Sequence, residues 1–94
     1  MNNLCEIAKV LLEKMPRGKF YEENSLNLKI GDSITQQELL KKLISLGYKR
    51  ATMVSDMGEF SIRGDISDIY TLEEKPVRIE FWGDEIVDIR FFDN

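Results

Sequence analysis

The pattern of apolar and polar residues changes along the chain, and each pattern predicts a different kind of element. In residues 3–15 the apolar side chains recur at helical spacing, which predicts an amphipathic N-terminal helix. Residues 19–31 have weak periodicity and predict a connector, with a short extended piece over 26–30. From residue 60 onward apolar and polar residues alternate, and this period of two is typical of half-buried antiparallel strands.

The most sharply marked boundary is the start of a second helix at Thr35. Thr35-Gln36-Gln37-Glu38 has the spacing of a capping box, in which the first and fourth residues bond each other's backbone amides. Ile34 and Leu39 can close a hydrophobic staple around this turn, and Gly47 is suited to a left-handed stop. The buried stripe of this helix is expected to contain Leu39, Leu40, Leu43, Ile44 and Leu46.

Four strands are predicted after Gly47, at 48–55, at 60 to about 70, at 76–82 and at 86–92, with turns at 56–59, 73–76 and 83–85. The expected fold class is α+β: a four-stranded antiparallel β-meander packed against the helix at 35–46, with an additional N-terminal helix. We expect one compact domain, in which residues 1–31 form the N-terminal helix and connector and residues 32–94 form the α+β module.

Two arginines are expected to leave the same face of this sheet. If the turn at 56–59 closes a hairpin with Ser55 opposite Phe60, Arg50 and Arg63 become diagonal neighbours about 7 to 8 Å apart on the outward face. Two forked guanidinium groups could together recognise an anionic partner. From their spacing alone they are ordinary surface residues, paired with Asp65 or Glu80 across the sheet.

The alternation fails within the predicted strand 60–70. Continuing the inward face of Ile62 would bury Asp68 and expose Ile69, so a β-bulge near Gly64-Asp65 is predicted to restore the pattern.

The composition excludes several function classes. The chain has no histidine and one cysteine, Cys5, which is expected to be a buried structural residue; zinc sites and Ser/His or Cys/His nucleophile arrangements are therefore not expected. Residues 54–94 carry four basic and eleven acidic side chains, which argues against direct nucleic-acid binding. No apolar run is long enough to span a membrane and no secretory signal is evident, so a cytoplasmic location is expected.

Two further features have ordinary structural explanations. Trp82, before the Gly83-Asp84 turn, is expected at the edge of the core, and the acidic run Asp84, Glu85 and Asp88 is expected to be a solvated turn and not a metal site.

The stretch GYKRATMVSDMGEFSIRGDISDIYTLEEKPVRIEFWGDEIVDIRFFD, residues 47–93, resembles the UvrB-like module of the transcription-repair coupling factor (Mfd) family, which also forms the second domain of UvrB. The motifs GY-x-R, G-E-F-x-x-R-G, D-I-[FY] and R-I-E-F-[FW]-G-D-E-I match in order and spacing. The upstream segments LLEKMPRG and SLNLKIGDSITQQELLKKL are also similar to the coupling-factor version.

This resemblance implies a docking module for UvrA, the damage-recognition protein of nucleotide excision repair. The implied UvrA-binding residues are Arg50 and Arg63, together with Phe60 and Ser61 of the second motif; UvrB proteins commonly have an arginine where Ser61 stands. The resemblance also implies that the docking surface is masked by another domain in the whole resting protein. No cofactor is expected in this chain.

The chain is expected to be a non-enzymatic piece of a larger ATP-dependent DNA translocase that acts on stalled RNA polymerase, because it lacks the G-x-x-x-x-G-K-[ST] phosphate loop. The alternatives are domain 2 of a UvrB-type excision nuclease subunit and a structural spacer between motor domains. A nucleic-acid module using Tyr48, Phe60 and Phe92 is a third possibility. If the N-terminal helix exposes its apolar stripe, it could drive dimerisation.

Overall fold

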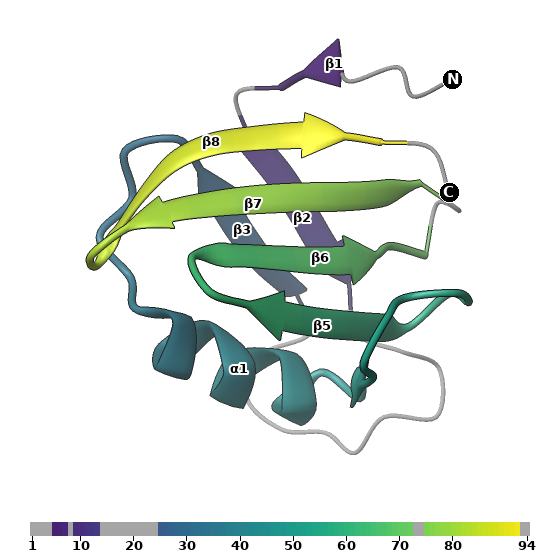
Figure 1. Cartoon of the computed structure of the whole chain (residues 1–94). Helices are drawn as coiled ribbons and strands as arrows, with labels where there is room; N and C mark the ends of the chain where they lie inside the picture. Colours follow the sequence, from purple (N-terminus) through teal and green to yellow (C-terminus); the bar gives the residue numbers. More distant parts are fainter. Residues whose placement is uncertain (1–4, 8, 14–24, 73–74, 93–94) are drawn as a thin grey trace.

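The computed structural model describes residues 5–7, 9–13, 25–72 and 75–92 (Figure 1). In these residues it has one helix and eight strands, which confirms the α+β class. The elements in chain order are β1 (Cys5–Glu6), β2 (Lys9–Glu13), β3 (Ser25–Lys29), α1 (Gln36–Ser45), β4 (Lys49–Arg50), β5 (Glu59–Arg63), β6 (Ile66–Tyr70), β7 (Pro76–Trp82) and β8 (Glu85–Phe91).

The main sheet has six strands in the order β1-β8-β7-β6-β5-β4. Strands β5 to β8 form an antiparallel meander, while β4 runs parallel to β5 at the edge. The predicted strands at 76–82 and 86–92 are therefore confirmed to within a residue. The predicted first strand, 48–55, is wrong, because only Lys49–Arg50 is extended and it pairs in the opposite sense.

The predicted strand 60–70 is in fact two strands. Arg63 pairs with Ile66 across a tight turn at Gly64–Asp65, where Gly64 has φ 59, so the chain reverses and no bulge is needed. Reversal also explains the broken alternation, because Phe60 and Ile62 face the core before the turn, and Ser67 and Ile69 face it afterwards. A register irregularity does occur, but between β7 and β8 at Glu80/Phe81.

The predicted N-terminal helix is wrong, since Cys5–Glu6 and Lys9–Glu13 are strands. The run Val10-Leu11-Leu12 fits a helical stripe and a strand equally well, and pairing of β2 with β3 decides between them. Val10 and Leu12 are buried while Leu11 is half exposed, which is the alternation of a strand. The expected helix stop at 16–18 lies outside the described residues, and the expected dimerisation stripe does not form.

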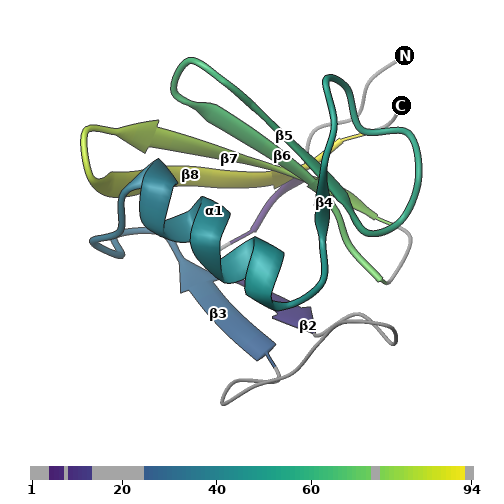
Figure 2. The same ribbon diagram turned by 90° about the horizontal axis from the view of Figure 1, so that it is seen from below.

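Both α1 and the β2–β3 pair lie on the same side of the main sheet (Figure 2). They enclose one apolar cluster, so residues from 1–31 and from 32–94 share a core. The predicted extended piece at 26–30 is confirmed as β3, with Leu28 buried. Fully buried members of the cluster are Leu12, Leu39, Leu43, Phe60, Ile69, Val77, Ile79, Ile86 and Ile89.

The capping box at Thr35 is confirmed. The Thr35 hydroxyl accepts from the Glu38 amide at 3.1 Å, and Glu38 Oε1 accepts from the Thr35 amide at 3.0 Å. The hydrogen bonds that the Thr35 amide and hydroxyl donate to the Glu38 carboxylate lower the pKa of Glu38. Gly47 follows the helix with φ 97, as its position predicts, whereas Ile44 is exposed and was wrongly assigned to the buried stripe.

Tyr48 connects the helix exit to the β2–β3 pair. Its ring is buried, and its hydroxyl donates to the backbone carbonyl of Glu13 at 3.1 Å. Burial, with a smaller contribution from the negative charge of Glu13, raises the pKa of Tyr48 to about 12.

Replacing Thr35 by alanine should lower the free energy of unfolding by about 1 kcal/mol, because the Glu38 amide loses its acceptor. Urea unfolding followed by circular dichroism measures this loss. Thr35→Ser should retain most of the stability, and Gln37→Ala, in the same turn without a capping role, should not be destabilising. Equal stability of Thr35→Ala and wild type would contradict the assignment.

Stability should fall as the pH rises from about 10 to 12. Folding disfavours the ionised form of Tyr48, so the neutral side chain contributes its full stabilisation below the unfolded pKa of about 10. This contribution, roughly 3 kcal/mol, is lost as the pH rises from the unfolded pKa through the folded pKa of about 12. Urea unfolding across this range should show a steeper decline for the wild type than for Tyr48→Phe, which cannot ionise. Parallel declines in the two proteins would refute this role for Tyr48.

Candidate functional site

The main sheet has an apolar inner face toward α1 and a polar outer face on the opposite side. Residues paired across strands point to the same side of a sheet, so the register defines two neighbouring rows on the outer face. One row is Ser61, Asp68, Arg78 and Arg90, and the next is Arg63, Ile66, Glu80 and Asp88.

Asp68 organises the centre of this outer face. Its Oδ1 accepts from Arg78 Nε at 2.9 Å, and its Oδ2 accepts from Arg78 Nη2 at 3.3 Å and from Arg63 Nη2 at 3.2 Å. The Asp68 side chain is only 5% exposed, and two guanidinium groups offset the cost of burying its charge. We call Arg63, Asp68 and Arg78 the Asp68 network.

Arg78 is held from two directions. The hydrogen bond to Asp68 is the main cause that raises the pKa of Arg78. The Phe92 ring centroid lies 4.6 Å from its guanidinium carbon, which adds a cation–π contact. Next to it on the outer face, Arg90 forms an ion pair with Asp88.

Arg63 is the member of the network that faces solvent. Its side chain is 61% exposed, although one Nη atom is bound to Asp68. A guanidinium group has five N–H donors, so this arginine keeps donors for an external acceptor while one end is held in place.

Arg50 does not share the outer face with Arg63, and the predicted hairpin register is wrong. Arg50 of β4 pairs in parallel with Phe60 of β5, whose side chain faces the core. Arg63 is three residues after Phe60 on β5 and faces outward. Arg50 is nevertheless exposed, at the sheet edge. The two Cα atoms are about 11 Å apart by strand geometry, further than the predicted diagonal contact.

The other two predicted site residues are buried. Phe60 is fully buried in the apolar cluster, and Ser61 is buried on the outer side opposite Asp68. The side chain of Phe60 is thus occupied in core packing in this conformation. Phe60 and Ser61 therefore have a structural role within the sequence motif.

Sequence analysis missed the role of Glu59, which shapes the loop between β4 and β5. Glu59 Oε1 accepts from the Ser55 amide at 2.9 Å, the Ser55 hydroxyl at 3.2 Å and the Asp56 amide at 3.1 Å. The first of these bonds is the largest cause that lowers the pKa of Glu59. Lys49 pairs with Glu59 on the outer side of the sheet. Of the two basic residues of β4, Lys49 and not Arg50 therefore faces that side. The sequence signal for this loop was a serine and an aspartate, Ser55 and Asp56, three to four residues before a glutamate that can accept hydrogen bonds from them.

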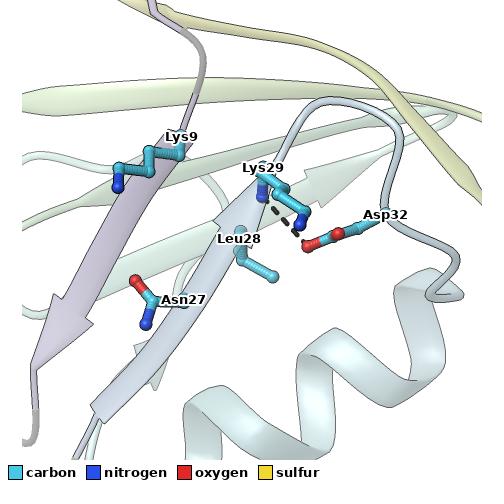
Figure 3. Close-up of a pocket in the computed structure, with 5 residues that line it drawn as sticks. All are labelled: Lys9, Asn27, Leu28, Lys29 and Asp32. Atoms are coloured by element: carbon cyan, nitrogen blue, oxygen red, sulfur yellow. Dashed lines mark hydrogen bonds between the residues drawn. The ribbon is translucent and has the colours of Figure 1, made fainter.

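An open recess of about 320 Å³ lies on the β2–β3 pair and the turn that follows β3, away from the outer face. It is lined by Lys9, Asn27, Leu28, Lys29 and Asp32, and Figure 3 shows the Asp32 carboxylate directed at the Lys29 amide, which donates to it at 3.0 Å. This bond closes the β3 turn, so the recess has a structural explanation.

Within the described ranges, no three His, Cys, Asp or Glu side chains gather as metal ligands would. The helix of the described part is too short and too polar to cross a membrane.

Comparison with known proteins gives a consistent assignment. Residues 26–94 match the family model for the UvrB interaction domain. Similar proteins include transcription-repair-coupling factors of Staphylococcus haemolyticus strain JCSC1435 (44% identical over 75 residues), Staphylococcus aureus strain USA300 (43% over 75 residues) and Staphylococcus epidermidis strain RP62A (45% over 73 residues). These alignments cover 80%, 80% and 78% of this chain and about 6% of each relative.

The matched segment contains α1, strands β4 to β8 and all but the first residue of β3, so it includes both faces of the meander and the whole Asp68 network. The chain belongs to the UvrB interaction domain family.

Proposed function

We propose that this chain is a protein-interaction module of a transcription-repair coupling factor and that it binds UvrA. The observation that carries the proposal is the family match over residues 26–94, supported by similar proteins that are named transcription-repair-coupling factors. The outer face supplies a physical basis, because it displays an exposed arginine whose guanidinium group is hydrogen-bonded to Asp68.

Arg63 is the central contact in this proposal. The Asp68 network holds the guanidinium group in one place before a partner arrives, which reduces the conformational entropy lost on binding. The exposed N–H groups of Arg63 can then donate to a carboxylate of UvrA in the forked geometry that arginine favours.

Arg50 is a second contact, reached around the sheet edge. In the part of the chain that the structure describes, its side chain has no ion-pair or hydrogen-bond partner, so the guanidinium group is available to an acidic group. A partner that covers the β4–β5 edge can contact Arg50 from one side and Arg63 from the other, since a typical interface is wider than about 11 Å.

The wider activity belongs to a longer protein. The chain spans about 6% of the coupling factors it matches, and it lacks the phosphate-binding loop of ATP hydrolases. We propose that the remainder of that protein is an ATP-dependent translocase that engages DNA and stalled RNA polymerase in the cytoplasm, and that this module brings UvrA to the stalled complex.

Isothermal calorimetry of the chain with UvrA should show binding that weakens by about 10-fold or more for Arg63→Ala and further for Arg50→Ala plus Arg63→Ala. Higher salt should also weaken it, because charged groups form the contact. The melting transition should change little, since Arg78 still donates to both oxygens of Asp68 and the Arg63 side chain is mostly exposed.

The matched control is Lys9→Ala plus Lys29→Ala, which removes the same charge from two exposed residues that pair on β2 and β3. It should bind UvrA like the wild type. If both double variants lose the same affinity for UvrA, the effect comes from net charge alone. If the double arginine variant binds UvrA like the wild type, Arg50 and Arg63 are not contacts. Absence of binding by the wild-type chain would favour a structural spacer.

A further inference from the structure

Trp82 is the most exposed large apolar side chain in the described residues, at 80%, and it is the only tryptophan in the chain. The sequence predicted it at the edge of the core, and the structure places it on the outer face, at the last residue of β7. Val87, the residue of β8 that has no partner at the register irregularity, is also partly exposed. Exposed tryptophan of this kind is typical of interface centres.

The residues around Trp82 are acidic. Glu85 is its paired residue on β8, Asp84 is in the connecting turn, and Glu80 is two positions earlier on the same face of β7. Asp65, in the β5–β6 turn, is close by, because its carbonyl accepts from the Phe81 amide at 2.8 Å. Both turns lie at the left-hand end of the sheet in Figure 1.

These carboxylates differ from Asp68 and Asp88, which lie elsewhere on the outer face. Asp68 and Asp88 are neutralised by arginines, whereas Glu80, Asp84, Glu85 and Asp65 have no ion-pair or hydrogen-bond partner for their side chains among the described residues. An aromatic ring surrounded by free carboxylates is complementary to a cationic side chain, which can lie over the ring and approach the acids together.

This acidic end is continuous with the arginine-bearing centre. Arg63, Ile66 and Glu80 are paired in one row, and Trp82 lies two residues beyond Glu80. By strand geometry the Cα atoms of Arg63 and Trp82 are about 12 Å apart, which is within the width of one ordinary protein interface.

We infer that the outer face binds its protein partner through two contacts of opposite charge: Arg63 takes a carboxylate, and Trp82 with its surrounding carboxylates takes an arginine or lysine side chain. This inference rests on the proposed binding of UvrA and adds a second specificity-determining contact to it. The opposite charges of the two contacts would also set the orientation in which the partner docks.

The test uses the sole tryptophan as a reporter. The chain is labelled with 5-fluorotryptophan, and its ¹⁹F NMR signal is followed during titration with unlabelled UvrA. A shifted signal at saturation is expected, because the ring becomes covered by a cation. In calorimetry, Trp82→Ala should weaken binding by about 10-fold, and Glu80→Gln plus Glu85→Gln by roughly 3- to 10-fold.

Ile44→Ala is the matched control, because Ile44 is 56% exposed on α1, which lies on the other side of the main sheet from this patch (Figure 2). It should bind like the wild type. If UvrA binding depends on Arg63 while the ¹⁹F signal and the affinity of Trp82→Ala are unchanged, the second contact is refuted and the proposed function stands. If the wild-type chain does not bind UvrA, the proposed function fails and this inference fails with it.

Discussion

Burial of one apolar row across the meander is the constraint on which the rest of the structure depends. Phe60, Ile69 and Val77 are paired across β5, β6 and β7, and all three are fully buried beneath α1 and the β2–β3 pair. Because side chains alternate along a strand, fixing these three inward forces their neighbours Ser61, Asp68 and Arg78 outward. A shift of one residue would place Asp68 in the core, so the packing that stabilises the domain also positions its polar face.

The outer face has few unmatched charges at its centre and several at one end. Asp68 is buried only because Arg78 and Arg63 satisfy both of its oxygens, and this arrangement orients an exposed arginine without a metal or a rigid loop. At the Trp82 end the carboxylates have no such partners among the residues that the structure describes. The two kinds of surface differ in their ion pairs. In a structural polar network each charge has a partner within the chain, whereas a surface for an external partner leaves charges unpaired.

The family assignment gives a context for the outer face of the described residues, with its arginines, carboxylates and exposed tryptophan. A domain that covers about 6% of its relatives need only fold independently and present a face to other molecules. Its single shared core meets the first requirement. The proposed contacts meet the second with side chains on regular strands, which are held more rigidly than loop residues.

The amino-acid sequence by itself determined the elements whose signals are local. The capping box at Thr35, the stop at Gly47, strands β7 and β8 and the turn at Gly83 all depend on residues within a few positions of one another. The motifs around Arg63 were likewise sufficient for the family resemblance. Only the tertiary structure decided whether Val10-Leu11-Leu12 formed a helix or a strand, because its partner β3 lies beyond residue 24. It also decided that β4 pairs in parallel and separates Arg50 from Arg63, since strand pairing depends on long-range contacts that no local pattern encodes.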